Sequence, residues 1–167
     1  MLIARYAKII MSLLLASFCL LVAFDNLTDY GTNFAFVQHV LSMDTIFPSS
    51  TIKYRAITNP TLHHAAYAII IAAEIAVAVL CWIGVTMLAR RLRANAAAFN
   101  RAKTIGVIGL TLGFLLWQVG FMSIGGEWFG MWMSQQWNGI PSAFRYLVMT
   151  LGVLIFLSLP DHNTSEP

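Results

Sequence analysis

Four long apolar runs, each interrupted only by isolated polar residues, set the pattern of the sequence. A helix needs about 20 mostly apolar residues to cross the hydrocarbon core of a bilayer. Runs of this length predict four membrane-spanning helices, which we place at residues 6–24, 63–88, 104–124 and 143–159. The expected fold class is an all-α integral membrane protein, a four-helix bundle that forms one membrane domain over residues 1–159.

Polar connections separate the four spans. We expect segments 25–62 and 125–142 to lie on one side of the membrane as an ordered cap, and the loop 89–103 to lie on the other side. A loop as long as the first of these would be unusual without structure of its own. Residues 160–167 have the composition of a short polar tail.

The first cap segment carries a helical pattern. Its apolar residues recur at the spacing of one helix face: Tyr30, Phe34, Val37 and Leu41. This spacing predicts a short amphipathic helix on the membrane surface or over the bundle. Asn59 followed by Pro60 predicts the start of the second span, with a capping side chain and a proline in the first turn.

The second cap segment gathers three of the five tryptophans in the stretch GGEWFGMWMSQQWNG, residues 125–139. Trp128 and Trp132 are four positions apart, so on a short helix they would share one face, close to Glu127. Tryptophan rings collect at the headgroup level of membranes, which favours an interfacial aromatic belt. A stacking wall for a flat ligand and a docking surface for a partner are the alternatives.

Basic residues predict the orientation, because lysine and arginine concentrate on the cytoplasmic side of membrane proteins. Seven of the ten basic residues lie before or at the start of the first span or between the second and third spans: Arg5, Lys8, Arg90, Arg91, Arg93, Arg101 and Lys103. Both termini are therefore predicted to be cytoplasmic, with the cap on the outer side.

Composition narrows the function classes. The chain is 59% hydrophobic and 10% charged, whereas soluble domains are nearer 45–50% apolar and about 25% charged. The net charge of +3 is small and no basic stripe with interleaved aromatic residues is present, so we exclude nucleic-acid binding. The sequence has no phosphate-binding loop, zinc-protease motif or nucleophile elbow. The pattern favours a non-enzyme without a metal site or cofactor.

Glu74 is the polar residue least expected within a membrane span. It lies on the order of 14 Å from the start of the second span, where an ionised carboxylate must face the protein interior or be neutralised. Tyr67 and His63 fall on the same helix face, and Gln118 lies at a similar depth in the third span. We expect Gln118 to hydrogen-bond Glu74.

The line from His63 to Glu74 has two interpretations. One is an internal hydrogen-bonded contact that fixes helix packing, and the other is a path for a proton or a ligand. The candidate ligand-binding residues lie along this line, at the depth of Glu74 in the third span, or in the tryptophan-rich segment: Glu74, Gln118, Tyr67, His63, Trp128, Trp132 and Glu127.

The glycine spacing predicts a helix-packing face, and the histidines suggest a candidate haem site. Gly106, Gly113 and Gly120 repeat every seven residues, which predicts one smooth face on the third span for close helix approach. A haem between His39 and either His63 or His64 is a weaker alternative, since imidazoles suit iron.

Three stretches resemble a known family: NLTDYGTNFAFVQHVLSMDTIFP, RAITNPTLHHAAY and GGEWFGMWMSQQWNGIPSAFR. They look like the bacterial family of predicted small integral membrane proteins, domain-of-unknown-function family 2165. The resemblance covers nearly the whole chain. It implies a multi-pass protein of the bacterial inner membrane, and it implies no activity and no catalytic residues.

These observations favour a non-enzymatic accessory or assembly subunit, which packs in the bilayer against another membrane protein or against copies of itself. Its small size, its glycine face and the lack of a catalytic constellation support this interpretation. The alternative is a ligand- or redox-binding module that holds a quinone-like or lipid molecule beneath the tryptophan-rich cap. A haem protein and a transporter are less favoured.

Overall fold

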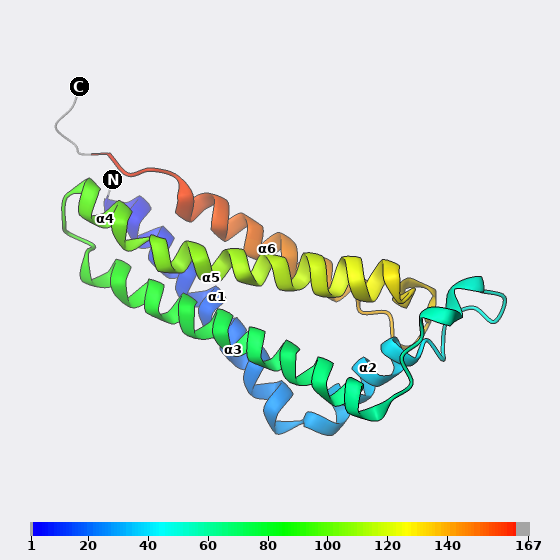
Figure 1. Cartoon of the computed structure of the whole chain (residues 1–167). Coiled ribbons are helices and arrows are strands. Elements are labelled where there is room, and N and C mark those ends of the chain that lie inside the picture. The colour runs from blue at the N-terminus through cyan, green and yellow to red at the C-terminus, as the bar shows by residue number, and fades with distance from the viewer. Residues whose placement is uncertain (1, 163–167) are drawn as a thin grey trace.

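The computed structural model describes residues 2–162, and every regular element among them is a helix. Four helical rods are long and apolar enough to cross a membrane. They are α1 (Leu2–Thr28), α3 (Pro60–Arg90), a third rod made of α4 (Ala96–Ala102), α5 (Thr104–Leu115) and the π-helical η2 (Leu116–Trp128), and α6 (Ile140–Ser158). Figure 1 shows these rods as one elongated bundle. The predicted all-α fold with four spans is confirmed.

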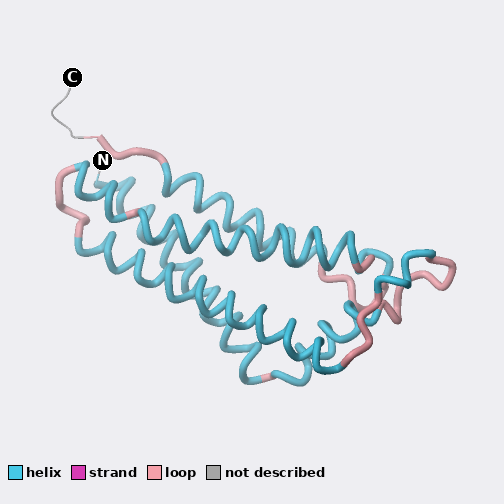
Figure 2. The backbone as a smooth tube through the Cα atoms, in the orientation of Figure 1, coloured by secondary structure: helices cyan, strands magenta, loops and turns pink. Residues whose placement is uncertain are grey.

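Three short helices lie at one end of the bundle. They are α2 (Tyr30–Ser42) and the 3₁₀ helices η1 (Thr51–Arg55) and η3 (Met131–Met133). The opposite end holds α4, the start of α1 and the end of α6, as the backbone trace shows (Figure 2). We call these the α2 end and the α4 end. The amphipathic helix predicted in the first cap segment is confirmed by α2.

The second cap segment folds differently from the prediction. Trp128 is the last residue of η2, whereas Trp132 lies in the separate helix η3, beyond a left-handed turn at Gly130. The expectation that both rings lie on one short helix is therefore wrong. A glycine with φ of 64° breaks the helix between them, because this backbone conformation costs glycine little and other residues more.

Local capping explains where α3 begins. The Asn59 side chain accepts a hydrogen bond of 2.9 Å from the Thr61 backbone N–H, and Pro60 occupies the first helical position. Both features were predicted from the sequence. The spans are longer than predicted, since α1 continues to Thr28 and α3 to Arg90.

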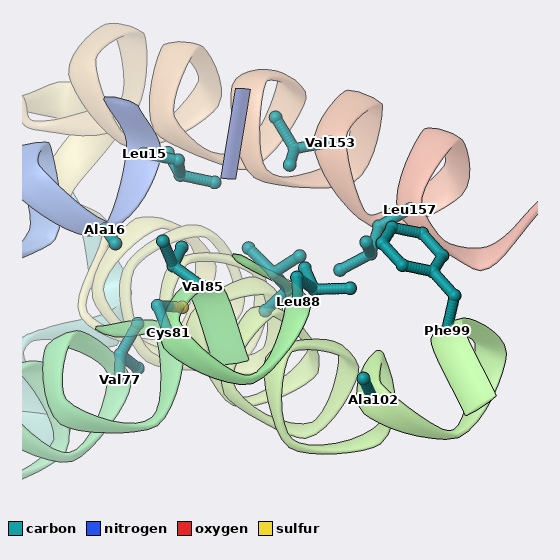
Figure 3. Close-up of a cluster of buried hydrophobic side chains, with 11 residues drawn as sticks. Leu15, Ala16, Val77, Cys81, Val85, Leu88, Phe99, Ala102, Val153 and Leu157 are labelled. Atoms are coloured by element: carbon teal, nitrogen blue, oxygen red, sulfur yellow. The ribbon is translucent and has the colours of Figure 1, made fainter. Parts of the chain in front are cut away.

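A cluster of buried apolar side chains joins all four rods near the α4 end and in the middle of the bundle. Figure 3 shows Leu15 of α1, Val77 and Leu88 of α3, and Leu157 of α6 pointing into this cluster. Phe99 of α4 closes it with a fully buried ring. Lipid tails are as apolar as these side chains, so close packing rather than exclusion of water holds them together in a bilayer.

Glycines bring α3 and α5 into backbone contact. A Cβ placed on Gly84 would lie 2.5 Å from the Gly106 Cα atom, and one on Gly113 would lie 3.2 Å from Val77. The predicted close approach is thus confirmed for Gly106 and Gly113. Gly120 does not share it, because its nearest neighbour is Leu116 of its own helix at 3.7 Å. The π-helical stretch begins at Leu116 and changes the side-chain register after it.

Large apolar side chains cover the outside of the bundle. Ile3 is 85% exposed and Ile69 is 70% exposed, and similar residues occur on α5 and α6. A water-soluble protein rarely exposes so much contiguous apolar surface. Lipid tails are the environment that this surface fits.

Asp161 organises the α4 end. Its carboxylate pairs with Lys8 at 2.7 Å, Lys103 at 2.6 Å and Arg5 at 3.5 Å, and all four side chains are buried. Burial alone would raise the pKa of Asp161, but hydrogen bonds from Lys103 and Lys8 hold that pKa below its usual range. The expected polar tail is therefore anchored at its second residue; positions 163–167 lie outside the described residues.

Arg5 and Lys8 also hold the neighbouring backbone. Arg5 donates hydrogen bonds to the carbonyl groups of Leu92 and Ala94 at 3.0 and 2.6 Å, and Lys8 donates to Leu159 at 2.6 Å. The start of α1 is thereby joined to the turn after α3 and to the end of α6. Cations suit these places, because helix C-termini expose unpaired carbonyl groups.

Candidate functional site

A cavity of about 580 Å³ lies inside the α2 end of the bundle. Residues from α1, α2, α3, η2 and α6 line it, together with the segment 136–139. Figure 1 shows that α3 and η2 diverge toward this end, where α2 packs. We call it the glutamate cavity, because Glu74 lies in its wall.

Glu74 is held by α1 rather than by the third span. The side chain is 4% exposed, and Glu74 Oε2 accepts a hydrogen bond of 2.8 Å from Asn26 Nδ2. Gln118 was the predicted partner, and this prediction is wrong. Asn26 takes the place predicted for Gln118, because α1 continues past residue 24 and brings Asn26 to Glu74.

Asn26 connects Glu74 with Tyr67. The Tyr67 hydroxyl donates to Asn26 Oδ1 at 2.8 Å, and Asn26 Nδ2 also donates to the Val22 carbonyl at 3.1 Å. The Asn26 amide is thus fixed from both sides, and its N–H group points at Glu74. The predicted link between Tyr67 and Glu74 exists, but it runs through a residue of α1.

Aromatic rings form much of the remaining wall. Trp117 and Phe121 of η2 and Tyr146 of α6 pack together, with centroid distances from Trp117 of 4.7 Å to Phe121 and 4.6 Å to Tyr146. Phe36 of α2 lies 6.4 Å from Trp137, and both also line the cavity. The aromatic residues come from three helices and one loop, and all of them meet around the same space.

The cavity wall carries two acidic side chains. Asp25 lies at the exposed rim, where Asn33 donates to it at 3.2 Å, and Glu74 lies buried within. None of the described residues that line the cavity is a lysine, an arginine or a histidine. The site therefore offers two carboxyl groups and no cation of its own.

The cavity does not continue toward the α4 end. Next to Glu74, a second void between Phe18 and Val77 has a volume of only about 10 Å³. Beyond it the apolar cluster fills the bundle, with Leu15 and Cys81 buried. In this conformation the bundle is packed between the glutamate cavity and the α4 end.

Five of the seven predicted ligand-binding residues do not line the cavity: Trp128, Trp132, Glu127, Gln118 and His63. Trp128 is 53% exposed and its ring packs under the Arg55 guanidinium at 4.6 Å. Trp132 is half exposed and packs edge-on against Phe47, and Glu127 is exposed. Gln118 is half-buried and does not line the cavity.

The tryptophans that do line the cavity were missed. Trp117 precedes Gln118 in the third span, and Trp137 ends the tryptophan-rich segment. Trp137 also stacks on His39 at 4.5 Å. Only Trp137 could have been suspected from the sequence, because it lies in the tryptophan-rich segment 125–139.

The three histidines His39, His63 and His64 each have their own set of partners. His63 is buried and its Nε2 lies 2.6 Å from the Ile57 carbonyl oxygen, so it is not part of the Tyr67–Glu74 connection. His64 stacks on Phe34 at 4.0 Å. His39 Nδ1 lies 2.8 Å from Asp44. Within residues 2–162, no three His, Cys, Asp or Glu side chains are placed to hold a metal ion together.

Comparison with known families agrees with this architecture. Residues 4–160 match the family model described as "Predicted small integral membrane protein". The chain belongs to domain-of-unknown-function family 2165. The resemblance stated from the sequence is confirmed, and the chain is an integral membrane protein with four apolar helices. No curated protein and no solved structure matches this member of family 2165.

Proposed function

We propose that this member of family 2165 binds a small organic cation, an amine or a quaternary ammonium group, in the glutamate cavity. One observation carries the proposal: the buried Glu74 carboxyl lies among aromatic rings, and no described lysine, arginine or histidine lines the cavity. A positively charged ligand would supply the missing counter-charge. A buried carboxylate otherwise has to be neutralised or paired.

The wall chemistry suits such a ligand. A cation within about 6 Å of an aromatic centroid is attracted by the ring face, most strongly by tryptophan, and aromatic cages are the usual sites for quaternary ammonium groups. Trp117 of η2, Tyr146 of α6 and Trp137 of the segment 136–139 provide rings from three parts of the chain. The volume of about 580 Å³ lies in the usual range of small-molecule sites.

The other candidates have less support. A quinone-like ligand is uncharged, so it would leave the Glu74 and Asp25 carboxyl groups of the wall without a counter-charge. Transport needs an opening toward the α4 end, where the packed cluster lies. The accessory-subunit prediction rested partly on a free glycine face, and Gly106 and Gly113 are packed against α3 within the same chain. A partner protein or a homo-oligomer stays a prediction.

We infer that the protein lies in a bacterial inner membrane with the α4 end in the cytoplasm. Seven of the ten lysine and arginine residues gather at that end, which supports this orientation. A phosphatase reporter inserted near Ser50 should then be active, and one fused after Arg93 should be inactive. The reverse pattern would place the glutamate cavity on the cytoplasmic side.

Charge selectivity tests the proposed function. Choline and 3,3-dimethylbutan-1-ol have nearly the same shape, but only choline is charged. We expect calorimetric titration of the purified protein to show at least tenfold tighter binding of choline, since a desolvated cation–π contact contributes about 2 kcal/mol. Equal affinities, or no choline binding at any concentration up to 100 mM, would refute the proposal.

A matched pair of variants locates the binding. Trp137→Ala removes a ring from the cavity wall and should weaken choline binding by about tenfold. Trp132→Ala removes a similar ring that lies outside the cavity and should leave the affinity unchanged. If Trp132→Ala has the larger effect, the ligand binds instead on the exposed surface around Trp128 and Trp132.

A further inference from the structure

A second pocket, of about 420 Å³, lies at the α4 end, at the opposite end of the bundle from the glutamate cavity. Arg90 and Arg91 at the end of α3 and Arg101 of α4 form its charged wall. Met87 and two alanines form its apolar part. We call it the arginine pocket.

The three guanidinium groups of this pocket have no polar partner among the described residues. Within residues 2–162, no ion pair or side-chain hydrogen bond involves Arg90, Arg91 or Arg101 through its guanidinium group. Asp161 is the carboxylate nearest to this end in the described chain, and it is buried between Arg5, Lys8 and Lys103. Among residues 2–162, the arginine pocket therefore has no carboxylate that pairs with its positive charge.

The backbone around the pocket is already fixed. Arg5 donates to the carbonyl groups of Leu92 and Ala94, which lie in the turn between Arg91 and α4. The Asn95 side chain accepts a hydrogen bond of 2.9 Å from the Ala98 N–H and caps α4. The buried ion cluster thus holds α3 and α4 in the arrangement that brings the three arginines together.

We propose that the arginine pocket binds a phosphoryl group, either the headgroup phosphate of an anionic phospholipid or a soluble phosphate. Guanidinium groups bind phosphate through paired, charge-assisted hydrogen bonds. Basic pockets between spans at the membrane surface are suited to anionic lipid headgroups. Met87 and the alanines beside the arginines offer the adjoining apolar contact. This inference is independent of the cation proposed for the glutamate cavity.

Two triple variants of the full chain test the site. One is Arg90→Gln, Arg91→Gln, Arg101→Gln; the control is Lys53→Gln, Arg93→Gln, Arg145→Gln. Both remove three positive charges, but the control charges lie outside the pocket. Native mass spectrometry of protein purified in dodecylmaltoside, with equal phosphatidylglycerol and phosphatidylcholine added, should show a preference for phosphatidylglycerol in the wild type and the control. The pocket variant should lose this preference by tenfold or more.

A second arm separates the two sources of phosphate. If millimolar inorganic phosphate raises the melting temperature of the wild type and displaces phosphatidylglycerol, the site accepts soluble phosphate. If it does neither, the lipid headgroup is the ligand. Equal loss of lipid in both triple variants, or no preference for phosphatidylglycerol and no phosphate binding in the wild type, would overturn the proposal. If the pocket triple variant does not fold, the single substitution Arg101→Gln gives the same comparison against Arg93→Gln.

Discussion

Asp161→Ala is expected to destabilise the bundle by about 3–5 kcal/mol, because removing one partner of a buried ionic cluster leaves the others uncompensated. Lys8, Lys103 and Arg5 would then lie buried without a counter-ion. The contact also joins the end of α6 to the start of α1, so its loss should release both. Thermal unfolding in detergent, followed by circular dichroism, measures the effect.

Asp29→Ala provides the control for this substitution, since Asp29 is an exposed carboxylate at the α2 end. It should change the melting temperature little. If Asp161→Ala and Asp29→Ala are equally harmless, the cluster at the α4 end does not stabilise the fold.

The same cluster predicts an acid dependence of stability. The folded-state pKa of Asp161 lies below its usual range, so its contribution is fully present above the unfolded pKa of about 3.9. It is lost as the pH falls through the lower folded pKa. The wild type should therefore lose stability below about pH 4 more steeply than Asp161→Asn, which cannot titrate there. Parallel pH profiles would contradict this assignment.

Glu74→Gln is expected to weaken choline binding by about 30-fold or more, since loss of one buried charged partner costs about 2–5 kcal/mol. A glutamine at this position still offers a side-chain oxygen to Asn26 Nδ2, so the shape and the hydrogen bond are kept. Stability should change little. Calorimetric titration gives the affinity, and the melting temperature reports the fold.

Glu74→Ala separates binding from packing. It leaves the Asn26 amide without its acceptor and should cost about 1–3 kcal/mol of stability. Gln118→Ala serves as the matched control, because Gln118 is also a polar residue within a span but does not line the cavity. If Glu74→Gln binds choline as tightly as the wild type, the carboxyl group is a packing element and not a ligand partner.

The sequence was most informative where a pattern repeats or an isolated residue breaks it. Apolar runs predicted the four spans, helical spacing predicted α2, and Asn59–Pro60 predicted the start of α3. Glu74 was identified as a candidate because an isolated carboxylate in an apolar run requires a partner. These inferences depend on local geometry and on the cost of burying charge, both of which can be read from a single chain.

The partners of Glu74 depended on features that helical periodicity does not contain. The hydrogen bond to Asn26 follows from the register of α1 against α3, and Asn26 lies beyond the predicted end of the first span. Trp117 lies in the cavity wall and its neighbour Gln118 does not, in the stretch where the helix changes from α to π at Leu116. A period of 3.6 residues cannot reveal such a change.

Asp161 was missed for a different reason. The residues after Pro160 looked like a solvated tail, so its carboxylate was not considered as a partner. The balance of charge could have indicated it. Seven lysine and arginine residues were placed at one end of the bundle, and buried cations require a counter-ion. Asp161 follows the last span directly and meets that requirement.

The central claim is that the glutamate cavity holds an organic cation between Glu74 and the aromatic rings. Arsenocholine has the shape and charge of choline, and its arsenic atom scatters anomalously. A crystal structure of the protein soaked with arsenocholine should show an anomalous peak inside the cavity, within about 6 Å of the ring centroids of Trp117, Trp137 or Tyr146. An empty cavity at saturating arsenocholine, or a peak confined to the surface around Trp128 and Trp132, would contradict it.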